Sequence, residues 1–168
     1  TVTSIANLVA NDGGDGISLR EAIQAANATG GTDYIYFNIA GTGVHTINIA
    51  STLPTITGQL IIDASTDDSF AANSNRPAII LDGNNLAANG LTLTNTADGS
   101  TIRGLVIRDF AGHGIEVQPG SDGNTIAGNF IGQFTAAGLD AGAAEANTGS
   151  GVVLAGANNT LGGTTAAD

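Results

Sequence analysis

The chain has 168 residues, 42% of them hydrophobic, with 25 glycines and no cysteine, methionine, tryptophan or lysine. Fifteen acidic residues against four basic ones give a net charge of −11, which excludes nucleic-acid binding by phosphate neutralisation and disfavours anionic membrane surfaces. The lack of cysteine excludes disulfides and thiol chemistry, and the length fits a single domain with a continuous core.

The first predicted element is an amphipathic helix over residues 18–27. Its apolar residues recur with helical spacing, and Ser18 with Glu21 three residues later forms a capping box. The Asn- and Gly-rich residues that follow are typical of a helix end. We expect this helix to lie across the open end of the first strands and to block edge pairing there. Residues 1–31 are therefore predicted to form an N-terminal cap.

Short strand-like segments follow the helix, separated by Gly, Asn, Asp or Ser corners. In several of them apolar and polar residues alternate, which predicts one face inside and one face outside. The predicted strands cover residues 34–39, 45–49, 59–63, 78–82, 90–94, 101–107, 114–118, 124–131 and 151–154.

Part of this pattern repeats at an interval of 24 residues. Residues 100–107 match residues 124–131 almost one for one, and a partial third copy lies within residues 151–163. Such a period is typical of a solenoid, in which each repeat must stack on its neighbours to bury its apolar face. An antiparallel sandwich would not repeat the same corner at a fixed interval. We therefore predict an all-β fold, a right-handed parallel β-helix over residues 32–168 with the N-terminal helix as its cap.

Two segments interrupt the repeat, namely the polar residues 67–76 and the Ala/Gly-rich residues 133–150. Insertions in a solenoid form loops on one side, often the binding side, so we expect contacts with a partner there. Residues 164–168 contain neither a capping helix nor a polar closing repeat. This predicts an open last coil, which either continues in a longer solenoid or docks onto another molecule.

Residues 18–23 (SLREAI) resemble the SLREAI/CSLREA-type motif near the start of many large bacterial surface and secreted proteins. Two positions depart from the pattern, because Ile17 takes the place of the motif's Cys and Ala64 that of a usual Gly. The resemblance implies a right-handed parallel β-helix in an extracellular or cell-surface protein, often one module of a long polypeptide, and it implies no catalytic residues. Companion motifs of the family are matched by residues 33–37, 45–47, 53–57, 61–64, 104–107 and 124–129.

The most specific enzymatic hypothesis is a polysaccharide lyase or epimerase, because parallel β-helices often hold enzymes that act on acidic sugars. Such a reaction needs a base near the sugar C5 proton and neutralisation of the uronate by Arg or Ca²⁺. The alternative, which the sequence favours, is that the candidates are corner and surface residues, since no aromatic platform for a sugar accompanies them. The candidates are Arg103, Arg108, Asp109, His113 and Glu116.

Four carboxylates are candidates for weak Ca²⁺ binding, namely Asp12, Asp15, Asp67 and Asp68. Neither segment matches an EF-hand loop or a Gly-rich nonapeptide repeat, and ordinary turn chemistry is the alternative explanation. The two histidines lack Cys or His neighbours at zinc-binding spacing. We therefore predict no cofactor beyond weakly bound surface Ca²⁺.

Together these observations predict a non-enzymatic structural or adhesive module, extracellular or at a bacterial cell surface. Its open end would stack end to end into a filament, so the partner is another copy, neighbouring repeats or a surface polysaccharide. The alternative is a polysaccharide-binding or polysaccharide-cleaving domain with a groove between the two inserted loops. The start at Thr1 favours a processed, exported form, and no apolar run is long enough to span a membrane.

Overall fold

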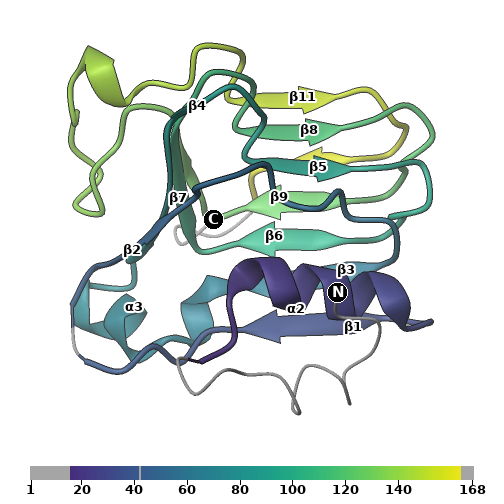
Figure 1. Cartoon of the computed structure of the whole chain (residues 1–168), viewed down its shortest axis with the longest axis horizontal. Coiled ribbons are helices and arrows are strands. Elements are labelled where there is room, and N and C mark those ends of the chain that lie inside the picture. The colour runs from purple at the N-terminus through teal and green to yellow at the C-terminus, as the bar shows by residue number, and fades with distance from the viewer. Residues whose placement is uncertain (1–15, 42, 164–168) are drawn as a thin grey trace.

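The computed structural model describes residues 16–41 and 43–163. Their strands form three parallel sheets, which the chain visits in turn (Figure 1). Sheet A contains, in spatial order, β1 (Asp33–Tyr36), β3 (Leu60–Asp63), β6 (Thr101–Arg103), β9 (Thr125–Ala127) and β12 (Thr160–Leu161). Sheet B contains β2 (His45–Asn48), β4 (Ile79–Leu86), β7 (Leu105–Phe110) and β10 (Phe130–Ile131). Sheet C contains β5 (Leu91–Leu93), β8 (Ile115–Val117) and β11 (Val152–Leu154).

Four helical segments accompany these sheets in the described part of the chain. The longest is α2 (Leu19–Ala28), which begins at the predicted capping box of Ser18 and Glu21. Hydrogen bonds from the Ser18 side chain and backbone lower the pKa of Glu21, which favours the charged form that caps the helix. The others are η1 (Ala64–Thr66), α3 (Asp68–Ala72) and η2 (Ala143–Glu145).

The predicted fold class is wrong. We predicted an all-β chain wound into one right-handed parallel β-helix, whereas the strands divide among three separate parallel sheets in an α/β-like arrangement with a few helices. Left-handed residues cause part of this division, because they end a strand and turn the chain towards another sheet. Gly104 (φ 79°) separates β6 from β7, and Gly128 (φ 62°) separates β9 from β10. Residues 101–107 and 124–131, each predicted as one strand, are therefore two strands each.

A second error concerns residues 67–76, which were predicted to be a loop. They contain the short helix α3, because the Asp67 side chain accepts a hydrogen bond from the Ser69 N–H and caps the helix start. The 24-residue repeat, by contrast, sets the register that the sequence predicts. Thr101 pairs with Thr125 and Ile102 with Ile126 in adjacent parallel strands.

The core consists of apolar side chains that stack from one strand to the next. In sheet A, Ile35 pairs with Ile62, Ile62 with Ile102, and Ile102 with Ile126. All four side chains are buried, and burial of one such side chain is worth about 1.5–3 kcal/mol. Strands of two to eight residues are too short to be stable singly, so each one depends on its neighbours.

Polar corner residues stack in the same way. Asn124 accepts a hydrogen bond from the Ser100 N–H (2.8 Å), and its amide donates to Asn159 Oδ1 (3.0 Å). Asn159 Oδ1 also accepts from the Asn124 N–H (2.8 Å). These bonds between equivalent corner positions satisfy backbone N–H groups at the ends of the strands.

Helix α2 packs against the core near the first strands. Its residues Leu19, Ile23 and Ala26 join the core. On its other flank, the Asn27 amide donates to the Thr55 carbonyl (2.7 Å) and accepts from the Thr57 N–H (2.9 Å). The side chain thus occupies the hydrogen-bonding groups that a neighbouring strand would use.

We expect Asn27→Ala to lower the free energy of unfolding by about 1 kcal/mol, because the Thr55 carbonyl and the Thr57 N–H lose their partner. Thermal unfolding followed by circular dichroism measures the change. Asn48→Ala is the matched control, because Asn48 is exposed and its side chain makes no hydrogen bond to the described residues. Equal stability of the Asn27→Ala variant and the control would contradict the capping role.

Candidate functional site

The outer face of sheet A presents two columns of side chains in register. One column contains Tyr34, Ile61, Thr101, Thr125 and Thr160, one from each strand in spatial order. The other contains Tyr36, Asp63, Arg103 and Ala127. Strands lie about 4.8 Å apart in a sheet, so Tyr36 and Arg103, two strands apart, are about 10 Å from each other along this face. We call these two columns the A-face.

Two exposed aromatic rings stand at one end of the A-face. Tyr34 is 58% exposed and Tyr36 is 61% exposed, and their ring centroids lie 5.8 Å apart at an angle of 43°. Both tyrosines also border an open hollow of about 600 Å³ between α2 and β1. A contiguous exposed apolar patch is typical of an interaction surface, whereas single exposed apolar side chains are common.

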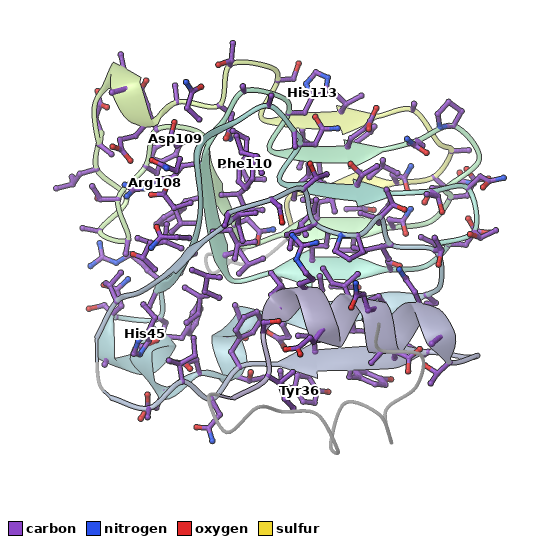
Figure 2. The ribbon with its side chains drawn as sticks, in the orientation of Figure 1. Tyr36, His45, Arg108, Asp109, Phe110 and His113 are labelled. Atoms are coloured by element: carbon purple, nitrogen blue, oxygen red, sulfur yellow. The ribbon has the colours of Figure 1, made fainter. Side chains whose placement is uncertain are left out.

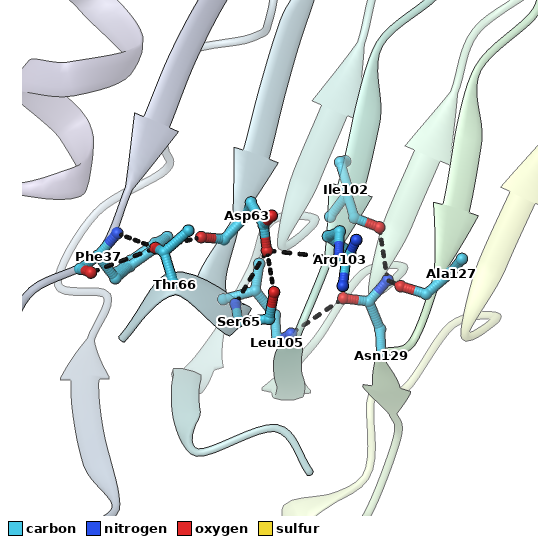
Figure 3. A network of polar contacts seen from close by, with 9 residues as sticks. All are labelled: Phe37, Asp63, Ser65, Thr66, Ile102, Arg103, Leu105, Ala127 and Asn129. Atoms are coloured by element: carbon cyan, nitrogen blue, oxygen red, sulfur yellow. Dashed lines mark hydrogen bonds and ion pairs between the residues drawn. The ribbon is translucent and has the colours of Figure 1, made fainter. Parts of the chain in front are cut away.

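Next to the tyrosines lies an ion pair that is fixed by its surroundings (Figure 3). Arg103 Nε is 3.3 Å from Asp63 Oδ1, which also accepts a hydrogen bond from the Ser65 N–H at 3.0 Å. On the neighbouring strands, Asn129 donates to the carbonyls of Ile102 and Ala127. The Ser65 N–H and hydroxyl group both donate to Asp63 and hold it in place, whereas about half of the Arg103 side chain is exposed.

The structure distributes the predicted catalytic residues over different sheets. Arg103 lies on sheet A, Arg108 and Asp109 on sheet B, and Glu116 on sheet C. Figure 2 shows Arg108 and Asp109 on one side of the molecule, away from His113 at the opposite end of the view from Tyr36. A lyase or epimerase needs its base and its uronate-neutralising group at one place, and these residues do not converge.

Three of the four remaining candidates, all except Asp109, have a structural partner among the described residues. Arg108 pairs with Asp82 (2.9 Å) and with Glu145 (3.2 Å), which ties residues 133–150 to sheet B. His113 Nδ1 accepts a hydrogen bond from the Ser150 N–H (2.9 Å). Glu116 accepts from the Asn89 amide (2.9 Å), whose oxygen accepts from the His113 N–H, so only these two candidates are linked.

The two inserted segments pack against each other over sheet B instead of flanking a groove. The Asn73 amide donates to the Ala136 carbonyl (2.7 Å), and Arg76 donates to the Ala137 carbonyl (3.0 Å). Ala136 is itself buried, in a small cluster with Ile80 and Val106 on the outer side of sheet B. The outer face of sheet B is therefore covered by the chain itself.

Of the four calcium candidates, the structure places Asp67 and Asp68. Asp12 and Asp15 lie outside the described residues, and Asp68 is exposed in the first turn of α3. Asp67 is only 2% exposed, and its oxygens accept hydrogen bonds from the Ile39 N–H (2.8 Å), the Ser69 N–H (3.0 Å) and the Ser69 hydroxyl. Within residues 16–41 and 43–163, no three His, Cys, Asp or Glu side chains gather in a way that would hold a metal ion.

Sequence reasoning did not single out Tyr34 and Tyr36, and it placed no aromatic ring on the same face as Arg103. The signal was present in Asp-Tyr-Ile-Tyr-Phe at residues 33–37, where alternation places both tyrosines on the face opposite Ile35. Their proximity to Arg103 depends on the pairing of β1 with β3 and of β3 with β6.

Comparison of the chain with protein-family models, with curated proteins and with solved structures gives no match. The resemblance to SLREAI/CSLREA-type surface proteins thus stays a prediction. Among the described helices, none has the length and apolarity that crossing a membrane requires.

We expect acid stability to depend on Asp67. Burial alone would raise the pKa of this carboxyl group, but hydrogen bonds from Ser69 and Ile39 and the charge of His45 lower it below its ordinary value. A carboxyl group with a lowered pKa in the folded state stabilises the fold above its unfolded pKa, and this contribution disappears as the pH falls through the folded pKa. Wild-type stability should therefore decline below about pH 4.

Asp67→Asn should lower stability at neutral pH by about 1–3 kcal/mol, because an amide nitrogen cannot accept the hydrogen bonds of a carboxylate oxygen. Its stability should then decline less steeply in acid than that of the wild type. Urea unfolding at pH values between about 2.5 and 7 tests this, with Asp68→Asn as the control that removes the same charge from an exposed neighbour. Parallel pH profiles for all three proteins would contradict the role of Asp67.

Proposed function

We propose that the protein is a non-enzymatic structural or adhesive module outside the cell, which associates end to end through the strand edges of β10, β11 and β12. These three strands are the last in their sheets, and β11 lies at the opposite side of the view from α2 (Figure 1). The exposure of Leu161 is the observation that carries this proposal.

Leu161 occupies a core position without core surroundings. It pairs in register with Ile126 and so continues the stack of Ile35, Ile62, Ile102 and Ile126. Ile126 is 1% exposed, whereas Leu161 is 59% exposed. Because an inward-facing leucine gains stability only when it is covered, this end fits a partner that supplies the next layer.

The backbone of β12 supports the same conclusion. The Thr160 and Gly162 N–H groups donate back to the carbonyls of Asn124 and Ile126. In a parallel strand alternate residues direct their N–H groups to opposite sides, so the Leu161 N–H points away from β9. An unpaired edge of this kind is a template for pairing with another strand.

The two ends of the molecule differ, and this difference determines the kind of association that we propose. A head-to-tail filament would need access to both ends, but α2 already takes up part of the first end, where Arg20 and Asn27 hydrogen-bond to residues 52–57. Association through like ends of two copies leaves α2 in place and closes on itself. We therefore propose a pair of molecules joined at β10, β11 and β12 rather than a continuous filament.

The remaining support comes from charge and from the candidate catalytic residues. A chain with a net charge of −11 and no lysine resists nonspecific association and suits an environment rich in divalent cations. The candidate residues for sugar chemistry lie on three different sheets, which favours a structural or adhesive role over an enzymatic one. Weak Ca²⁺ binding belongs to the same proposal, because bound cations would reduce repulsion between two acidic molecules.

We expect Leu161→Lys to weaken self-association, because a charged side chain would be buried without a partner in the paired state. The dissociation constant of the pair should rise by about tenfold or more. Light scattering across a concentration series, with and without Ca²⁺, measures it. Leu139→Lys is the control, since Leu139 is 66% exposed in the segment 133–150. A wild-type protein that stays monomeric throughout, or equal effects of both substitutions, would overturn the proposal.

A further inference from the structure

Among the outer faces of the three sheets, the A-face combines aromatic, hydroxyl and charged groups on one surface. The outer face of sheet B is covered by the inserted segments, which bury Ala136 against Ile80 and Val106. The outer face of sheet C presents Thr92, Glu116 and Val153 in register, without an aromatic ring. Of the three outer faces, the A-face is thus the one that is open and presents aromatic, hydroxyl and charged groups together.

The tyrosine pair supplies an apolar surface that a polar ligand can still use. An aromatic face carries partial negative charge and attracts the polarised C–H groups of a sugar ring, while the phenol group remains available for hydrogen bonds. Two rings 5.8 Å apart on one strand form a broad platform. The exposure of both rings shows that the described chain does not use them for its core.

The polar groups of the A-face continue the platform across the strands. Asp63 and Arg103 follow Tyr36 in the same column, and Thr101, Thr125 and Thr160 follow Tyr34 and Ile61 in the other. Carboxylate oxygens accept hydrogen bonds, guanidinium groups donate them, and hydroxyl groups do both. A ligand rich in hydroxyl groups could form hydrogen bonds with each of these groups along the A-face.

The charge of the site indicates which class of such ligands fits. Asp63 and Arg103 neutralise each other, the tyrosines and threonines are neutral, and the whole chain carries −11. A polyanionic saccharide would be repelled by the chain and would find no unpaired cation on the two columns. A neutral polysaccharide meets neither obstacle.

We propose that the A-face binds a neutral polysaccharide chain, which stacks on Tyr34 and Tyr36 and runs across the strands towards Arg103 and the threonines. This proposal goes beyond the end-to-end association described above, because it uses a different surface and a different partner. It gives an adhesive module the kind of target to which it would adhere.

Tyrosine fluorescence tests this directly, because Tyr34 and Tyr36 are the only tyrosines and the chain contains no tryptophan. All intrinsic emission in this range therefore comes from the proposed site. The probes are cellohexaose, maltohexaose and laminarihexaose as neutral saccharides, and oligogalacturonate as the acidic comparison. We expect a saturable change in emission with a neutral probe and none with the acidic one.

Variants connect the signal to the platform. Tyr34→Ala and Tyr36→Ala should each weaken binding of the active probe by about tenfold in calorimetry, whereas Tyr36→Phe, which keeps the ring, should retain most of it. Leu139→Ala is the control for loss of an exposed apolar side chain elsewhere. Circular dichroism verifies that each variant is folded.

Four results would overturn the proposal. These are the absence of any emission change with the neutral probes, preferential binding of oligogalacturonate, and unchanged affinity of both Ala variants. The fourth is an emission change that follows protein concentration without saccharide and disappears in Tyr36→Ala, which would assign the A-face to a second copy of this chain. Weaker self-association in Leu161→Lys with intact saccharide binding would show that the two surfaces act independently.

Discussion

The structure depends on the stacking of apolar side chains in register between short parallel strands. Ile35, Ile62, Ile102 and Ile126 form one such stack in sheet A. Ile62 and Ile102 are each covered by a neighbour on both sides, and none of the strands could bury its own inward face alone. A stack of this kind has two ends, and each end exposes both apolar side chains and unpaired backbone groups unless something covers it. Whether each end of the stack is covered therefore determines whether that end can bind another molecule.

The two ends are treated differently. At the first end, α2 buries Leu19 and Ile23 in the core, and the amide of Asn27 takes the place of a neighbouring strand. At the other end, Leu161 continues the isoleucine stack without a covering layer in the described chain. The outer faces are also unequal, since residues 67–76 and 133–150 cover sheet B whereas the A-face remains open. The proposed self-association and the proposed saccharide binding thus use different surfaces, one at an end and one on a side of the molecule.

Local patterns allowed some features to be predicted from sequence. The helix at residues 19–28 follows from the Ser18–Glu21 capping box, and the register of Ile102 with Ile126 follows from the 24-residue repeat. The fold class was wrong, because a repeat determines which residues stack but not how strands group into sheets. Gly104 shows the reason: its left-handed conformation ends β6 and starts β7, and a lone glycine within a strand pattern does not reveal this. The A-face was missed for a related reason. Tyr36 and Arg103 lie in one column only because β1 pairs with β3 and β3 with β6, and these strands are distant in sequence.

Amide hydrogen exchange at Leu161, measured over a series of protein concentrations, tests the unequal ends most directly. The account predicts that the Leu161 N–H exchanges rapidly in dilute protein and becomes protected as the concentration rises. The Thr57 N–H, which Asn27 covers, should stay protected at every concentration. Exchange at Leu161 that is slow in dilute protein, or that does not change with concentration, would contradict the claim that this end is open and pairs with a second molecule.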